Sequence, residues 1–267
     1  MSGMRHNGPI ALVFHTLVVG FVLAPLIVIC LVAFTPANTL TLPSTQFSLR
    51  WFTAVFAHPD FVASFLNSLW VAAIAATIAV VLAVAAGLAL DRYDFRGRGA
   101  LNALFLSPLM IPHLVLGVAL LRLFALVGAT GSLLWLTAGH IVVVTPYVLR
   151  LVLAALSGLD RSAEQAAVTL GASSWIVFRR ITVPMILPGI SGGWLLAFIN
   201  SFDELTMSIF ITSPATVTLP VRMYMYATES IDPMMAAVSA LMIAVTAVAM
   251  LLLDRIFGLD KILVGQG

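Results

Sequence analysis

Six long apolar stretches limit what this chain can fold into more than any other feature. They cover residues 10–34, 62–90, 100–124, 133–153, 185–212 and 234–253. A helix needs about 20 mostly apolar residues to cross the hydrocarbon core of a bilayer, and each stretch reaches that length. Because 61% of the 267 residues are hydrophobic and only 9% are charged, one water-soluble core cannot hold them all. The sequence predicts an all-α integral membrane protein, a single domain over residues 1–267 with six transmembrane helices.

Lysine and arginine are concentrated in alternate connections between these stretches. One set of connections and termini contains Arg5, Arg92, Arg96, Arg98, Arg150, Arg161, Arg179, Arg180, Arg255 and Lys261, and the other contains only Arg50 and Arg222. Short cytoplasmic loops carry an excess of these residues, so we expect both termini to be cytoplasmic. The formal charge of +2 reflects this bias and does not indicate nucleic acid. The basic loop at Arg92, Arg96 and Arg98 is attributed to topology and to lipid headgroups.

The connection after the first stretch contains a short amphipathic segment. Residues 48–56 place Trp51, Phe52, Val55 and Phe56 on one helical face. This pattern is typical of a helix that lies in the outer membrane interface.

A polar stretch, residues 160–182, separates the fourth and fifth apolar stretches. Ser162 and Gln165 have the spacing of a capping box, which predicts a helix over 163–170. Gly171 can adopt the left-handed conformation that ends a helix, and a second helix is expected to begin at Ser173 or Ser174.

The first of these helices has the composition of a docking surface. Ala163, Ala166 and Ala167 allow close approach by another surface, while Glu164 and Gln165 offer polar contacts. We interpret the helix, turn and helix as a cytoplasmic site for a soluble partner.

Polar residues also interrupt the end of the fifth stretch. Asn200, Glu204, Ser208 and Thr212 recur every four residues, and Asp203 adjoins them, which predicts one polar stripe on a helix. A carboxylate facing lipid costs on the order of 3 kcal/mol, so these groups should face a cavity or a partner. The stripe either lines a translocation path that favours a cation or forms an interhelical pair, for example with Arg122 or Arg222.

The spacing around Gly171 resembles the signature of a known family. That signature is E-A-A, three residues, G, nine residues and I-x-L-P, and the chain has Gln165, Ala166 and Ala167, then Gly171, then Ile-Thr-Val-Pro at 181–184. It departs at Gln165 and conservatively at Val183. The chain therefore resembles the inner-membrane permeases of binding-protein-dependent ABC importers with the type I fold.

The resemblance implies several partners. A second, different permease subunit would complete the pathway in the bacterial inner membrane, a soluble binding protein would deliver the solute, and two cytoplasmic ATPase subunits would hold ATP and Mg. The loop 160–182 would be the coupling segment, and its contact residues would be Glu164, Gln165, Ala166, Ala167 and Gly171. The chain lacks a phosphate-binding GxxxxGK[ST] sequence, so we expect no catalytic residue, cofactor or metal of its own.

The residues around Asp203 narrow the resemblance further. An acidic pair after Ser201 and Phe202 resembles the spermidine/putrescine branch, which implies pathway roles for Asp203, Glu204, Asn200, Ser208 and Trp51. A polyamine is the favoured solute. Another amine, an amino-acid-like compound or an inorganic ion remains possible for the same fold, and a secondary transporter is a weaker alternative. His15, His113 and His140 lack metal-ligand spacing and are interpreted as packed or hydrogen-bonded histidines.

Overall fold

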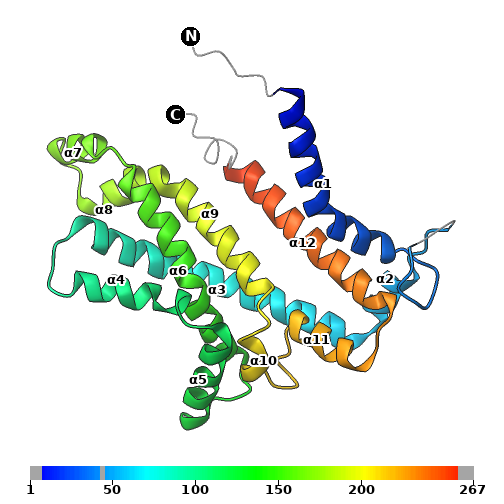
Figure 1. Cartoon of the computed structure of the whole chain (residues 1–267). Coiled ribbons are helices and arrows are strands. Elements are labelled where there is room, and N and C mark those ends of the chain that lie inside the picture. The colour runs from blue at the N-terminus through cyan, green and yellow to red at the C-terminus, as the bar shows by residue number, and fades with distance from the viewer. Residues whose placement is uncertain (1–7, 43–45, 258–267) are drawn as a thin grey trace. The chain divides into compact units, whose positions relative to one another are not determined.

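The computed structural model describes residues 8–42 and 46–257, in which every regular element is a helix (Figure 1). Arg5 and Lys261, which contributed to the expected orientation, lie outside these residues. The elements in chain order are α1 (Pro9–Val32), α2 (Arg50–Ala57), α3 (Pro59–Arg92), α4 (Arg98–Leu106), the 3-10 turn η1 (Ser107–Leu109), α5 (His113–Leu126), α6 (Leu133–Ser157), α7 (Ser162–Thr169), α8 (Ser174–Val177), the π-helical turn η2 (Phe178–Thr182), α9 (Val183–Phe202), α10 (Ser208–Ile211), α11 (Leu219–Glu229) and α12 (Pro233–Phe257).

Residue contacts group the chain into two compact units. The first unit consists of Met1–Pro59 and Met223–Val245, and the second consists of Asp60–Arg222 and Thr246–Gly267. The expected coupling segment and the acidic pair belong to the second unit, whereas Trp51 belongs to the first.

The first unit contains α1, α2, most of α11 and the start of α12. Helix α1 buries only Val32 within the chain, so its apolar side chains are available to lipid or to another subunit. Helix α2 confirms the short helix expected over residues 48–56, but the fold buries Val55 and leaves Phe56, which was expected on the same face, exposed. The backbone N–H of Ser48 donates to Phe34, and the Phe34 and Phe52 rings lie 5.0 Å apart, which ties the end of α1 to α2.

The core of the second unit is formed by α3, α6 and α9. Helix α3 turns a row of small residues toward its neighbours, a composition that allows membrane helices to approach closely; the buried alanines of this row are Ala72, Ala75, Ala76, Ala79, Ala83 and Ala86. Gly87 continues the row, where an added Cβ would lie 2.9 Å from Val152 of α6. Helix α9 approaches α6 in the same way through Gly189 and Gly193.

Replacing Gly189 by alanine should destabilise the α6–α9 contact. A Cβ at this position would lie 2.6 Å from the Ala155 Cβ and 2.8 Å from the Leu151 carbonyl oxygen, so the two helices must separate. Overpacking of this kind costs about 1–3 kcal/mol in the free energy of unfolding, measured in detergent micelles. Gly192→Ala is the matched control, because its Cβ would lie 3.9 Å from the nearest atom. Equal stabilities of the two variants would contradict the assigned helix contact.

The membrane-crossing helices agree with five of the six expected spans. In the described residues, Pro9–Val32, Pro59–Arg92, Leu133–Ser157, Ser174–Phe202 and Pro233–Leu252 are each long and apolar enough to cross a bilayer. The span expected over 100–124 is present as a sharply bent pair of helices, and Pro108 and Pro112 within it favour a kink. The two helical segments, Arg98–Leu109 and His113–Leu126, meet at an angle of 106°.

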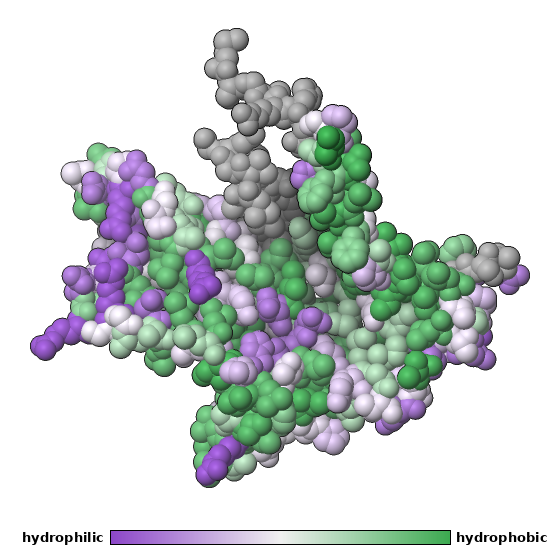
Figure 2. All heavy atoms as spheres, viewed as in Figure 1, coloured by the Kyte–Doolittle hydropathy of each residue, from purple (hydrophilic) through white to green (hydrophobic). Residues whose placement is uncertain are grey.

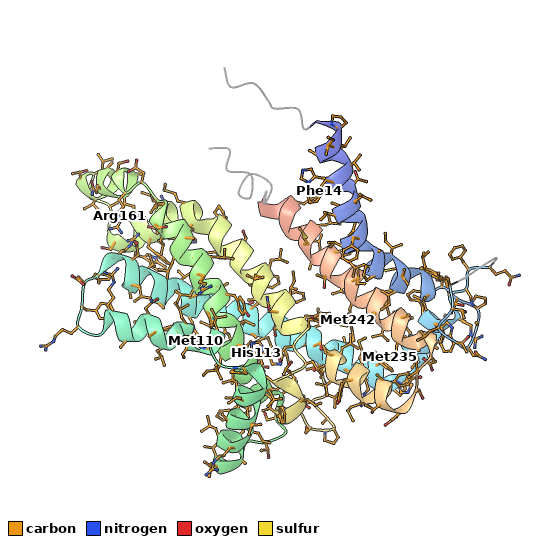
Figure 3. The ribbon with its side chains drawn as sticks, viewed as in Figure 1. Phe14, Met110, His113, Arg161, Met235 and Met242 are labelled. Carbon is orange, nitrogen blue, oxygen red and sulfur yellow. The ribbon has the colours of Figure 1, made fainter. Side chains whose placement is uncertain are left out.

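The bend has a local cause in the residues between the two segments. Pro112 is the N-cap of α5, and a proline disfavours helical geometry in the residue before it. Hydropathy averaged over the stretch does not detect the break, because both arms are apolar. Figure 3 shows Met110 and His113 at this corner.

Candidate functional site

The polar stripe expected along the fifth span is not present as a continuous helix face. Helix α9 ends at Phe202 with Asp203 as its C-cap, and a new helix, α10, begins only at Ser208. The four-residue spacing of Asn200, Glu204 and Ser208 therefore does not place them in a row. The expected stripe is wrong because the helix stops at Phe202. The Glu204 side chain instead accepts a hydrogen bond from the backbone of the following turn.

Glu204 is a buried carboxylate with two internal partners. Its Oε1 accepts the backbone N–H of Met207 at 2.7 Å, which organises the turn before α10. Its Oε2 lies 2.8 Å from Nδ1 of His113 at the start of α5. An ionised carboxylate only accepts hydrogen bonds, so the ring nitrogen is the donor. Glu204 thus forms an interhelical pair, as one of the two alternatives predicted, but its partner is His113 and not Arg122 or Arg222.

His140 forms a second buried bridge next to the first. Its Nδ1 lies 2.8 Å from Oγ of Ser201 in α9, and its Nε2 lies 3.0 Å from Oγ of Ser208 in α10. All three residues are buried. The histidine therefore joins α6 to both sides of the break after α9, and Ser208 is occupied in this contact.

Asp203 differs from its neighbour because its side chain is exposed on the chain. Among residues 8–42 and 46–257, no arginine, lysine or histidine lies within ion-pair distance of its carboxylate. An unpaired charge at the end of a membrane helix is costly against lipid, so Asp203 must face water, a solute or a partner chain.

Two further expected pathway residues also have contacts within the chain. Asn200 is half-buried and its amide donates to the Leu196 carbonyl at 2.8 Å. Trp51, in the first unit, donates from its indole N–H to the Ala37 carbonyl at 3.1 Å. The Arg50 guanidinium lies 4.7 Å from the centroid of the Trp51 ring, a cation–π contact that covers part of the ring face.

The loop 160–182 has the helix, turn and helix expected from its sequence. Helix α7 covers Ser162–Thr169, and Gly171 has a φ of 83°, which confirms the left-handed turn. Helix α8 begins at Ser174 after Ser173, whose hydroxyl accepts the N–H of Ile176.

Hydrophilic residues gather over α7 and the connection between α3 and α4, while α1 and α5 are mostly hydrophobic (Figure 2).

The expected capping box at Ser162 and Gln165 is wrong. Asp160 bonds Ser162 instead, accepting its backbone N–H and its hydroxyl, each at 2.9 Å. These hydrogen bonds to the ionised form hold the pKa of the Asp160 carboxyl below its usual value. The two-residue offset of this contact is that of an Asx turn, which competes with a capping box for the same backbone groups.

The polar residues of α7 point in different directions. Glu164 is buried and its Oε1 accepts from Arg92 Nη2 at 2.5 Å and from the Thr182 hydroxyl. Gln165 and Ala166 are exposed, Ala167 is half-buried, and Gly171 is exposed. The attribution of Arg92 to topology and headgroups alone was incomplete, because its guanidinium is part of this buried contact.

Comparison with known proteins defines the class of this chain. Residues 79–258 match the family model described as the inner membrane component of binding-protein-dependent transport systems. The chain belongs to this family. It is therefore the permease subunit of an ABC importer, with the type I permease fold, and it crosses the membrane several times.

Individual relatives of the permease agree with this assignment. The putrescine transport system permease protein PotI of Escherichia coli is 33% identical, covering 85% of this chain and 83% of the relative. The spermidine/putrescine permease PotC of Haemophilus influenzae is 31% identical over 79% of this chain and 81% of its own length. The sulfate permease CysT of Escherichia coli is 31% identical over 70% and 72%.

Solved structures support the fold of the permease. A bacterial ABC transporter that imports the acidic polysaccharide alginate superposes with a TM-score of 0.69 at 15% identity, covering 92% of this chain and 95% of that chain. A chain of the methionine transporter MetNI superposes with a TM-score of 0.63 at 20% identity, covering 73% and 94%. At these identities the likeness shows a shared fold.

The structure adds residues that reasoning from the sequence did not assign to the site. His113 and His140 were interpreted as packed or hydrogen-bonded histidines, which is confirmed, but their partners at the break after α9 were not predicted. Arg92 and Thr182 were not connected with Glu164. The available signal was the rarity of polar side chains within apolar stretches, since a buried histidine there needs a hydrogen-bonding partner.

Proposed function

We propose that this permease carries a small organic polycation, a polyamine of the putrescine or spermidine type, across the bacterial inner membrane. The names of the relatives PotC and PotI support this class of solute. The observation that carries the proposal is the exposed Asp203 beside a Glu204 that is already paired with His113. One carboxylate is satisfied within the fold and the other is free to attract an ammonium group.

The same proposal assigns the surrounding assembly. The permease pairs with a second, different permease subunit, and a soluble binding protein delivers the solute from the outer side. Two ATPase subunits, which hold ATP and Mg, dock on the exposed residues of α7, Gln165 and Ala166 first among them. Both termini are cytoplasmic. A structurally similar transporter, the bacterial alginate ABC transporter, was solved in complex with a periplasmic protein, which supports the binding-protein part of the assembly.

Sulfate is the competing solute, because CysT is also a relative. An exposed carboxylate disfavours a divalent anion, since like charges repel strongly where water is scarce. The Asp203 position therefore favours an amine over sulfate.

The experiment is uptake by the complete importer in liposomes with ATP enclosed on the ATPase side. We expect saturable import of labelled putrescine or spermidine that depends on the binding protein and is unaffected by excess sulfate. Import should persist when ionophores collapse all ion gradients, which separates this importer from a secondary transporter. Sulfate uptake with no polyamine uptake would overturn the choice of solute, and loss of uptake with ionophores would overturn the ATP-driven mechanism.

A further inference from the structure

The last turn of α3 and the first turn of α7 are joined by two ion pairs of opposite sense. Arg92 of α3 contacts Glu164 of α7 at 2.5 Å. The adjacent residue Asp91 contacts Arg161, the N-cap of α7, at 2.7 Å between Oδ2 and Nη2, and its carbonyl also accepts from the same nitrogen at 3.3 Å. A cation and an anion on each helix thus match an anion and a cation on the other. Figure 3 shows Arg161 at the base of α7.

Glu164, which pairs with Arg92, is the only residue of α7 that the fold buries; this is the inner pair, and Asp91 with Arg161 is the outer pair. Glu164 is 8% exposed, and every other residue of α7 is half-buried or exposed. Thr182, fully buried at the end of η2, donates its hydroxyl to Glu164 and accepts from Arg92 at 3.1 Å. Oε1 of Glu164 in α7 therefore contacts both α3, through Arg92, and η2, through Thr182.

The covalent route from α7 toward α9 does not run through this contact. It passes through Gly171, which has a left-handed backbone and no atom within 4 Å of the position where a Cβ would lie. It continues through the four residues of α8 and the π-helical turn η2. A glycine turn and a short π-helical segment are places where a helix bends, and π-turns recur at functional sites.

We infer that Glu164, with Arg92 and Thr182, is a mechanical clamp that transmits movement of α7 directly to α3. Glu164 is on this reading a positioning residue that acts through α3, and the exposed residues of α7 make the contact with the ATPase. The inference rests on the proposed ATP-driven function. It explains why a carboxylate in a docking helix points into the protein and not toward a partner.

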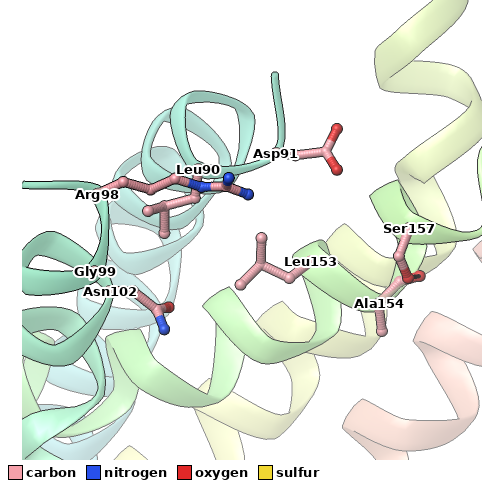
Figure 4. Close-up of a pocket in the computed structure, with 8 residues that line it drawn as sticks. All are labelled: Leu90, Asp91, Arg98, Gly99, Asn102, Leu153, Ala154 and Ser157. Atoms are coloured by element: carbon pink, nitrogen blue, oxygen red, sulfur yellow. Dashed lines mark hydrogen bonds between the residues drawn. The ribbon is translucent and has the colours of Figure 1, made fainter. Parts of the chain in front are cut away.

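The outer pair provides a matched control within the same two turns. The Arg161 side chain is 47% exposed and the Asp91 side chain 19%, against 26% for Arg92 and 11% for Glu164. Asp91 also borders an open cavity of about 540 Å³ that is lined by Arg98, Asn102 and Ser157 (Figure 4). Exposed ion pairs contribute little because water and salt screen them, whereas a buried carboxylate that loses its partner is left without compensation.

The test uses the complete importer in liposomes and measures solute imported per ATP hydrolysed. Removing a residue that couples two elements changes the coupling by about 2- to 30-fold, and we expect Glu164→Gln and Arg92→Gln each to lower this ratio about fivefold. Asp91→Asn should leave the ratio within about twofold of the unmodified protein, because solvent screens the Arg161 side of that pair. The exchange Arg92→Glu with Glu164→Arg should recover most of the ratio, because the two residues interact directly.

Assembly is followed in parallel by co-purification of the ATPase subunits. If Glu164→Gln prevents assembly, Thr182→Val becomes the test variant, because it removes only the hydroxyl that contacts Glu164 and Arg92. It is expected to lower the ratio of solute imported to ATP hydrolysed about twofold, the small end of such coupling effects. An unchanged ratio in Glu164→Gln, or in Thr182→Val where the first variant does not assemble, would overturn the clamp. Failure of the proposed function is a different result, since the unmodified importer would then show no ATP-driven polyamine uptake at all.

Discussion

Asp203→Asn is expected to lower polyamine uptake about tenfold while leaving assembly intact, the loss that corresponds to about 1.4 kcal/mol of interaction with the solute. The amide has the shape of the carboxylate but no charge, so attraction to an ammonium group is lost. Folding should not suffer, because Asp203 is exposed and has no ion-pair partner in the described residues. Initial rates of labelled putrescine and spermidine uptake measure the effect.

Asp94→Asn is the matched control for this charge removal. Asp94 lies in the connection between α3 and α4 with a side chain that is 99% exposed, and its contact with Arg98 is long at 3.9 Å. Its substitution should leave uptake unchanged. Equal uptake by Asp203→Asn and the unmodified protein would remove Asp203 from the pathway. A fall in uptake that accompanies loss of the assembled complex would instead identify Asp203 as part of a subunit interface.

His113→Leu is expected to destabilise the permease by about 1.5–3 kcal/mol, the range for a hydrogen bond to a charged group. The substitution leaves the buried Glu204 carboxylate with only the Met207 N–H as a partner. Because His113 begins α5 and Glu204 precedes α10, the loss should also loosen the contact between these helices. The free energy of unfolding in detergent micelles is the measurement.

Two control variants separate the hydrogen bond from other effects of the histidine. His113→Gln keeps an N–H donor and should recover part of the stability. His15→Leu removes an exposed histidine from the apolar helix α1 and should have little effect. A His113→Leu protein as stable as the His15→Leu protein would show that the contact with Glu204 contributes nothing to the fold.

Much of the fold follows from patterns within single segments. Apolar runs of sufficient length predict spans because the bilayer demands them wherever the neighbours lie. The turn at Gly171 is equally local, since glycine is the residue that best tolerates a positive φ. The prolines of the third span indicate a kink but not its angle of 106°. The end of the fifth span was not predicted, because the helix stops at Phe202 inside an apolar run. Hydropathy measures the preference for lipid and does not register a helix end.

The site was less predictable, because its contacts join residues far apart in the chain. Asp203 and Glu204 are adjacent and chemically alike, yet one is exposed and the other is paired with a histidine 91 residues away. The sequence did not distinguish Glu164 from Gln165 as the contact for a partner. In the structure Glu164 is buried and Gln165 is exposed. The partner of each buried charge depends on which helices pack together, and no local pattern contains that information.

The sequence by itself determined that this protein is a helical membrane protein with a polar loop of known spacing, and its motif indicated the permease family. These features depend on hydrophobic length, glycine geometry and short-range order. Only the tertiary structure decided that Glu204 pairs with His113, that Arg92 holds Glu164 across 72 residues, and that Asp203 is left free. A buried charge must find its partner in three dimensions, because the cost of leaving it unpaired depends on the packing around it.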